Sequence, residues 1–395
     1  MEWQKASKKD DATLVPSDWI HIHYYDALNT LFRLENSLRV FVYVVLKNRL
    51  FDKWSTINIT TDDANPATIA AIAKARRNQA QDFGYLGYDI NCPVMYLTSG
   101  ELIRIITDDN YWKYFKSYFP ASKQIIKHKL DEIGVIRNSL AHFRPLKSDD
   151  VEVIKNNANH ALSGVDHFLE QLGSCSDIVP TNTQEDWYLS LSNLGTGLCK
   201  LTLRQCEDQI WINLRFNYHC KVIIAHPSSA TYHPYRILNI VTPSILEQCR
   251  NIIKYATCLT EQRASEEDTY TPSRPSFSKV FSILFSRDVI SNHYQDIRND
   301  IDLLLNTIEA ETELISNDNL ARGKLVSVAP ISAQKDKASL WWSIHANDTI
   351  SPVNKDSLPE YWGNVYIGSM FTSTDQYPWM PIDVSEISLL GLPFD

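Results

Sequence analysis

Apolar residues recur at helical spacing through most of the first 172 residues. Leu31, Leu34, Leu38, Phe41 and Val45 follow one another at steps of three and four, and a similar stripe runs from Val151 to Leu172. This period predicts amphipathic helices that each pack one face. Capping and breaking residues place helices from Ser17 or Asp18 to about Asn48, from Asn65-Pro66 to Arg77, from the capping box Thr98-Ser99-Gly100-Glu101 onward, and from Ser148 to Gly173. We therefore expect an all-α bundle over residues 1–173.

The pattern changes after a polar linker at 174–186. Apolar residues alternate with other residues from Ile210 to Tyr218, which predicts a strand, with 221–226 and 236–241 as its partner strands. A helix is expected from Thr242-Pro243 to Thr257, which completes a small α+β module over 181–262. A helical segment is expected at 275–320, and residues 321–395 have no steady period and are expected to be irregular or β. The fold class is predicted to be α+β and multidomain.

One further helix carries a polar motif in its packed stripe. Its apolar positions recur every three or four residues. The members of this stripe are Ile126, Leu130, Ile133, Arg137 and Leu140. Asn138 and His142 are four apart and share another face, whereas Arg137 and His142 differ by about 140°. Pro145 requires the helix to stop soon after His142.

The segment Arg137-Asn138-Ser139-Leu140-Ala141-His142 ends one long helix and precedes a turn and another long helix. With this context it resembles the HEPN superfamily of helical domains, which occur in toxins, abortive-infection proteins and CRISPR-associated ribonucleases. The resemblance covers about residues 1–172. It implies a HEPN-like bundle, cleavage of RNA through the 2′-hydroxyl to a 2′,3′-cyclic phosphate without a metal, and a homodimer in which two Arg–His pairs face a shared cleft. It also implies a toxin or phage-defence effector that responds to a phage-derived trigger or an antitoxin.

The chemistry of these side chains fits that activity. His titrates near neutral pH, and Arg binds phosphate oxygens in pairs without losing its charge. We therefore expect His142 to transfer protons, Arg137 to bind the phosphate and Asn138 to orient either one. The further candidates are Lys127, Lys129 and Arg144 as RNA-binding residues, and Glu35, Asn36 and Arg39 as supporting polar residues from another helix. The alternative for Glu35 and Arg39 is an ordinary exposed i,i+4 ion pair.

Charge is divided unevenly along the chain. Residues 1–172 carry 21 Lys and Arg against 21 Asp and Glu, so the whole net charge of −9 lies in residues 173–395. The segment from Lys113 to Lys147 contains eight basic residues and two acidic ones. Such an excess of positive charge is suited to binding a phosphate backbone. Solubility alone is the alternative explanation. The aromatic run Tyr111–Phe119 is interpreted as core, with stacking on RNA bases as the alternative.

Other features exclude several classes of protein. Seven irregularly spaced cysteines argue against a disulfide framework, and the absence of a long apolar run argues against a membrane protein. The histidines and Cys220 lack the paired spacings of a metal site, so we expect no metal and no cofactor. Arg298-Asn299 repeats half of the motif, but Leu303 stands where His would be. We expect a cytoplasmic protein whose partner is RNA, with tRNA as one candidate.

Two other functions stay open. A HEPN domain can dimerise, bind nucleotides or act as an adaptor in a defence system without cleaving RNA. Alternatively, Arg137 is a buried counter-ion and His142 a helix-terminal residue, both purely structural. Exposure of both side chains in a dimer cleft would favour cleavage, whereas burial of Arg137 against Glu35 would favour the structural role.

Overall fold

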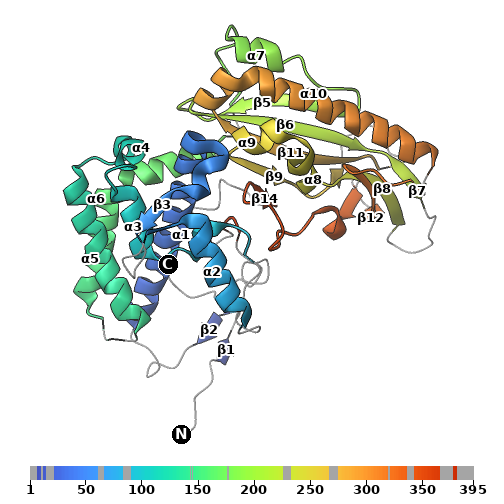
Figure 1. Ribbon diagram of the computed structural model, residues 1–395. Helices are drawn as coiled ribbons and strands as arrows, with labels where there is room; N and C mark the ends of the chain where they lie inside the picture. Colours follow the sequence, from blue (N-terminus) through green and yellow to red (C-terminus); the bar gives the residue numbers. More distant parts are fainter. Residues whose placement is uncertain are drawn as a thin grey trace. The chain divides into compact units, whose positions relative to one another are not determined.

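The computed structural model describes residues 7–9, 12–14, 22–60, 66–82, 90–142, 144, 146–175, 178–225, 233–266, 275–318, 321–335, 342–364 and 377–379. The chain mixes helices and sheets and forms two compact units, Met1–Glu170 with Gly368–Asp395, and Gln171–Ile367. Helices dominate the first unit, and sheets dominate the second (Figure 1). The predicted α+β class is therefore present in this coarse form.

The N-terminal unit is built around one long helix. Its helices are α1 (Ile22–Leu50), α2 (Ile69–Asp82), α3 (Ser99–Thr107), α4 (Trp112–Phe115), α5 (Lys123–Ala141) and α6 (Ser148–Gly173), the last of which continues past the unit boundary. Short 3-10 helices lie at Phe51–Thr56, Pro93–Tyr96 and Lys116–Tyr118. Two small antiparallel hairpins pair β1 (Ser7–Lys9) with β2 (Ala12–Leu14) and β3 (Asn58–Thr60) with β4 (Pro66–Thr68).

The middle of α1 is the core of this unit. Every residue from Val40 to Lys47 is buried, which is the pattern of a helix covered on all sides. Phe41 packs against aromatic rings from three other segments, Phe115, Tyr118, Phe119 and Phe168. The buried rings of the 111–119 run therefore belong to the core. Trp379, far away in sequence, lies edge-on to Tyr43 with ring centroids 5.0 Å apart.

Helix boundaries agree with several predictions and differ at others: α2 ends at Asp82 rather than Arg77, and the single helix predicted from Pro243 to Thr257 is two helices, Pro243–Gln248 and Arg250–Tyr255. α3 begins after Thr98 with both hydrogen bonds of the capping box, and α6 has the predicted bounds. Pro66 starts a strand rather than a helix, and the Thr68 hydroxyl accepts from the Ala71 N–H as α2 begins. The local pattern Asn65-Pro66 was misread because Thr68 supplies an equivalent cap three residues later. The predicted caps Ser17, Asp18 and Asn65 lie outside the described residues.

The described residues of the C-terminal unit form two sheets. The larger has the order β14 (Tyr361–Gly363), β9 (Cys258–Glu261), β11 (Phe277–Ser286), β6 (Trp211–Cys220) and β5 (Cys199–Gln205), and β10 (Ser265–Glu266) also pairs with β11. The smaller has the order β13 (Trp342–His345), β12 (Val326–Lys335), β8 (His233–Ile240) and β7 (Val222–Ala225). All pairs between these strands are antiparallel except β14 with β9.

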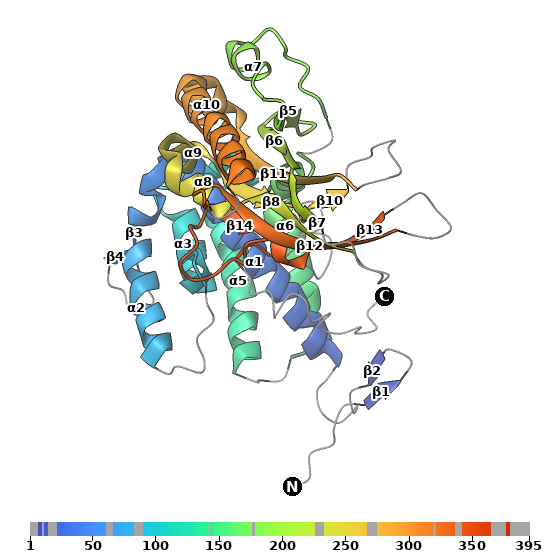
Figure 2. The same cartoon turned by 90° about the vertical axis from the view of Figure 1, so that its right-hand side faces the viewer.

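The described part of this unit also contains four α-helices. They are α7 (Asp186–Leu191), α8 (Pro243–Gln248), α9 (Arg250–Tyr255) and α10 (Arg287–Asn317), and Asn347–Thr349 is a short 3-10 helix. α10 lies within the predicted helical segment 275–320. Its residues Ile297, Ile301, Leu304 and Ile308 are buried, and Tyr294, one turn before them, is partly exposed. Figures 1 and 2 show α10 along one face of the larger sheet.

The two compact units do not follow the domain boundaries that the sequence pattern predicts. Residues 181–262, 275–320 and most of 321–364 belong to one unit, because β11 and β12 are central strands in its two sheets. β11 is buried at eight of its ten positions and shows no alternation, so its period did not reveal a strand. The segments 221–226 and 236–241 were predicted to pair with the strand at 210–218, which is wrong. The strands within them, β7 and β8, pair with each other, and β8 also pairs with β12, whereas β6 pairs with β5 and β11.

A buried ion pair joins the elements of this unit. Lys279 of β11 and Glu261 of β9 pair with no exposed surface on either side chain. Lys279 also donates to the carbonyls of Ile240 and Thr349, and Glu261 accepts from Thr242, Tyr361 and the Ser351 N–H. Every hydrogen-bonding position of both charges is thus occupied, as a buried pair requires. Over the part of the chain that the structure describes, no helix has the length and apolar character needed to span a bilayer.

Candidate functional site

Helix α5 presents two different faces. Ile126, Leu130, Ile133 and Leu140 are buried, as their spacing predicts. Arg137 continues this stripe, but its side chain is 36% exposed. A second stripe, composed of Asp131, Val135, Asn138 and His142, is exposed along its whole length. The motif therefore divides between an inner face that carries Arg137 and an outer face that carries Asn138 and His142.

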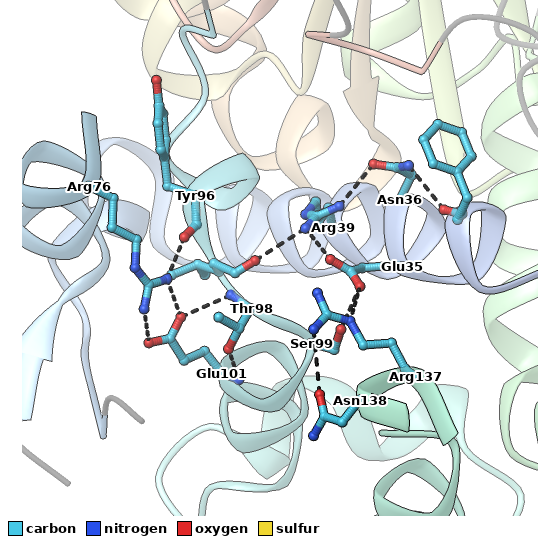
Figure 3. Close-up of polar contacts among 12 residues, drawn as sticks. Glu35, Asn36, Arg39, Arg76, Tyr96, Thr98, Ser99, Glu101, Arg137 and Asn138 are labelled. Atoms are coloured by element: carbon cyan, nitrogen blue, oxygen red, sulfur yellow. Dashed lines mark hydrogen bonds and ion pairs between the residues drawn. The ribbon is translucent and has the colours of Figure 1, made fainter. Parts of the chain in front are cut away.

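The carboxylate of Glu35 connects three helices. Its Oε1 accepts from Arg39 one turn along α1, and its Oε2 accepts from the Ser99 hydroxyl of α3 at 2.5 Å. Arg137 Nε of α5 lies 3.5 Å from the same Oε2 (Figure 3). The predicted supporting residue Glu35 is thus brought to the motif arginine by the packing of α1, α3 and α5.

Arg39 is held more tightly than an exposed i,i+4 pair would be. Both Arg39 and Glu35 are only 14% exposed, so the predicted alternative of an ordinary exposed pair is wrong. Arg39 also donates to Asn36 Oδ1 at 3.1 Å and to the Leu97 carbonyl at 3.3 Å. Burial lowers the pKa of Arg39, the Glu35 charge opposes that shift, and the Arg137 charge adds to it. Two cations therefore share one carboxylate.

A second ion pair fixes the start of α3, where Ser99 stands. Glu101 is fully buried and pairs with Arg76 of α2 through two hydrogen bonds of 2.6 and 2.8 Å. The same carboxylate accepts from the Thr98 N–H at 2.9 Å, and Arg76 also donates to the Tyr96 carbonyl. Figure 3 shows this pair beside the Glu35 group. Sequence reasoning missed Arg76 and Ser99, although Ser99 lies inside the capping box that it recognised.

The motif histidine lies at the end of α5. His142 is the C-cap, and its backbone N–H donates to the Asn138 carbonyl at 3.1 Å. Its side chain is exposed and makes no hydrogen bond, ion pair or ring contact with another described residue. Asn138 Oδ1 lies 3.5 Å from Arg137 Nη1, at the limit of a hydrogen bond. The structure thus brings Arg137, Asn138 and Glu35 together and leaves the imidazole apart from them.

The three predicted RNA-binding cations have different surroundings. Lys127 and Arg144 are exposed. Lys129 is half-buried and donates to Asn157 of α6 at 3.2 Å, and Asn157 in turn donates to Glu132 at 2.6 Å. Lys129 therefore stabilises the contact between α5 and α6, and it is less exposed than Lys127 and Arg144.

The space beside Arg137 is small. Glu35, Ser99, Gly134 and Arg137 line a hollow of about 20 Å³ together with apolar side chains of α1, α3 and α5. That volume holds about one water molecule and excludes a nucleotide. The hollow therefore offers no room for a ligand larger than water inside the unit.

The sequence also contains Arg298 in a second, incomplete motif and several histidines, a residue type that can bind a metal. Arg298 of the second, incomplete motif donates to the Ser190 carbonyl at 3.0 Å and lies 3.6 Å from Asp302, so it links α10 to the end of α7. Within the described ranges no three His, Cys, Asp or Glu side chains are placed to hold a metal ion; His226 lies outside those ranges.

Comparison with models of known protein families, with curated proteins and with solved structures found no match.

Proposed function

We propose that this protein is a metal-independent endoribonuclease of HEPN type. The proposal rests on the contacts and the exposure of the Arg137 side chain. Its Nε is positioned by the largely buried Glu35, yet more than a third of its side chain faces solvent. Its Nη2 makes no hydrogen bond within the described part of the chain. A guanidinium oriented from behind and open in front is suited to bind a phosphate oxygen.

The reaction requires only the movement of one proton and stabilisation of charge. The 2′-hydroxyl of RNA attacks its own phosphorus, the bond from phosphorus to O5′ breaks, and the proton passes from O2′ to O5′. His142 accepts or returns this proton, Arg137 binds the charged phosphate, and Asn138 orients either group. Acid–base catalysis by one positioned side chain accelerates such a reaction by about 10²- to 10⁴-fold. The products are a 2′,3′-cyclic phosphate and a 5′-hydroxyl.

A homodimer accounts for the position of Arg137 and His142 on two different faces of α5. Arg137 and His142 point about 140° apart on an ideal helix, so one α5 does not direct both side chains at one phosphate. The exposed stripe Asp131, Val135, Asn138 and His142 includes an apolar residue, Val135, that is 66% exposed. In the proposed dimer this stripe meets a second copy, so that RNA lies in a cleft between two motifs. Lys127 and Arg144 provide exposed positive charge beside it.

Two other functions are weighed by the same contacts. The ion pair between Arg137 and Glu35 favours a structural role, but a pair with this exposure contributes only about 0–1 kcal/mol. A nucleotide-binding role has less support, because the hollow at the motif is too small for a base. A dimerising adaptor stays open. The setting in a bacterial toxin or phage-defence system, and a location in the cytoplasm, belong to this proposal through the HEPN resemblance alone.

Cleavage of labelled total RNA and tRNA in excess EDTA tests the proposal. The purified full chain is compared with His142→Ala and with His128→Ala, which removes another exposed histidine from the same helix. We expect wild type and His128→Ala to leave cyclic phosphate ends and His142→Ala to lose at least 100-fold in rate. Full activity in His142→Ala would remove the catalytic assignment. Absence of cleavage by wild type, with a stable dimer in solution, would favour the adaptor.

A further inference from the structure

A pair of cysteines lies at the beginning of the C-terminal unit. Cys175 follows the end of α6 by two residues, and Cys206 follows the last residue of β5. An isolated bridge pairs Ile178 with Gln205, and the Gln205 N–H donates to the Ile178 carbonyl at 2.8 Å. This bridge places Ile178 beside the end of β5. Two cysteines 31 positions apart in sequence therefore meet.

The two thiols lie close enough for each to shift the pKa of the other. Cys206 Sγ also accepts from the Trp211 N–H at 3.3 Å across the turn between β5 and β6, which is closed by the bond from the Cys206 N–H to the Trp211 carbonyl. The donation from Cys175, together with the Trp211 and Ile210 amides, lowers the pKa of Cys206 to about 7 against the opposing effect of burial. Burial and the Cys206 charge raise the pKa of Cys175 well above its usual value. Cys206 is therefore the more readily ionised of the two thiols.

Three other described cysteines, Cys199, Cys249 and Cys258, differ from Cys206 in the direction of their pKa shifts. Burial raises the pKa of Cys199 and Cys249 to about 12 and raises that of Cys258 further. Cys258 is close enough to Cys175 for its charge to affect Cys175, so it is the competing partner. The pair itself is buried, but Ile178 and Ile210, which lie near the two cysteines in sequence, are 36% and 39% exposed.

We propose that Cys175 and Cys206 form a reversible disulfide, a redox modification site that is separate from the motif on α5. The oxidant is a low-molecular-weight disulfide. The Cys206 thiolate attacks one of its sulfurs, forms a mixed disulfide and releases a thiolate. Cys175 then loses its proton, attacks the Cys206 sulfur and releases the second thiol. Two electrons and two protons pass from the cysteine pair to the oxidant.

The bridge closes a loop that contains α7 and β5, both in the C-terminal unit. It ties the segment after α6 to the turn between β5 and β6. This inference does not depend on ribonuclease activity, because every residue that it uses lies outside the bundle formed by α1, α3 and α5.

The test is a peptide map of the folded, full-length protein after incubation with bis(2-hydroxyethyl) disulfide. Free thiols are blocked with N-ethylmaleimide in acid and denaturant before digestion. Trypsin leaves Cys175 and Cys199 on one peptide, so a second protease that cuts after Glu185 is needed to separate them. We expect more than half of the protein to carry a peptide linked between Cys175 and Cys206, and dithiothreitol to remove the link.

Variants distinguish the roles of the two sulfurs. Cys258→Ser should form the bridge as wild type does. Cys175→Ser should retain the oxidant as a mixed disulfide on Cys206, whereas Cys206→Ser should lose both products. A folded wild-type protein without the linked peptide would overturn the proposal, and so would links distributed among several cysteine pairs as in denatured protein. The wild-type map decides the question even where a serine variant does not fold.

Discussion

Arg137 Nε of α5 lies 3.5 Å from the carboxylate of Glu35, which stands in α1, about a hundred residues earlier in the chain. The same carboxylate binds Arg39 deeper in the unit. Glu35 is therefore the common anion of two cations that differ in burial, and the two arginines depend on it to different degrees.

Neutralising Glu35 should cost more stability than removing Arg137. Glu35→Gln leaves Arg39, only 14% exposed, without a counter-ion, and we expect a loss of about 3 kcal/mol in the free energy of unfolding. Arg137→Ala removes a cation that is 36% exposed, for which we expect about 0.5 kcal/mol. Urea unfolding measures both, with Glu152→Gln at an exposed position of α6 as the control. Equal losses in the two variants would contradict this ranking.

A charge at Val135 should separate the proposed dimer without unfolding the chain. Val135 is 66% exposed and lies in the stripe that carries Asn138 and His142. Val135→Lys is expected to produce a monomer by light scattering and to lose RNA cleavage at an unchanged melting temperature. Ile125→Lys is the matched control, because Ile125 is 49% exposed on a different face of α5. A monomeric wild-type protein that cleaves RNA would refute the dimeric site.

Two helical glycines should respond in opposite directions to replacement by alanine. A Cβ at Gly164 of α6 would stand 2.2 Å from the Tyr118 carbonyl oxygen, so Gly164→Ala forces α6 away and should cost about 2 kcal/mol. A Cβ at Gly134 of α5 meets nothing within 4 Å, and Gly134→Ala should stabilise by up to about 1 kcal/mol through helix propensity. Thermal unfolding compares the two. A stabilised Gly164→Ala would show that α6 does not approach Tyr118 this closely.

Breaking the buried pair of the C-terminal unit should be among the most damaging single changes. Lys279→Met leaves the Glu261 carboxylate buried without a cation, and we expect a loss of about 4 kcal/mol. The double variant Lys279→Met with Glu261→Gln should lose less than the sum of the two single variants by about 1–3 kcal/mol. Asp302→Asn breaks the exposed pair with Arg298 and should change stability by less than about 1 kcal/mol. Additive losses at Lys279 and Glu261 would show that the pair is not coupled.

The sequence alone determined the features that depend on local interactions. The stripe of α5, the capping box at Thr98 and the stripe of α6 follow from residues three or four apart, and the structure confirms them. Such contacts are made within one helix, so their spacing is visible before folding. The same local logic failed at β11, where layers cover both faces of the strand and erase its alternation.

Only the tertiary structure decided which distant residues meet. Glu35 reaches Arg137 because α1 and α5 pack together, and Ser99 joins them because Arg76 and Glu101 fix the start of α3. Cys175 reaches Cys206 because Ile178 pairs with Gln205. Long-range contacts of this kind leave no period in the sequence, since each depends on the burial of many other residues. The motif on α5 was therefore visible in the sequence. Glu35, which orients the motif arginine, could be named from the sequence only as one of several candidates.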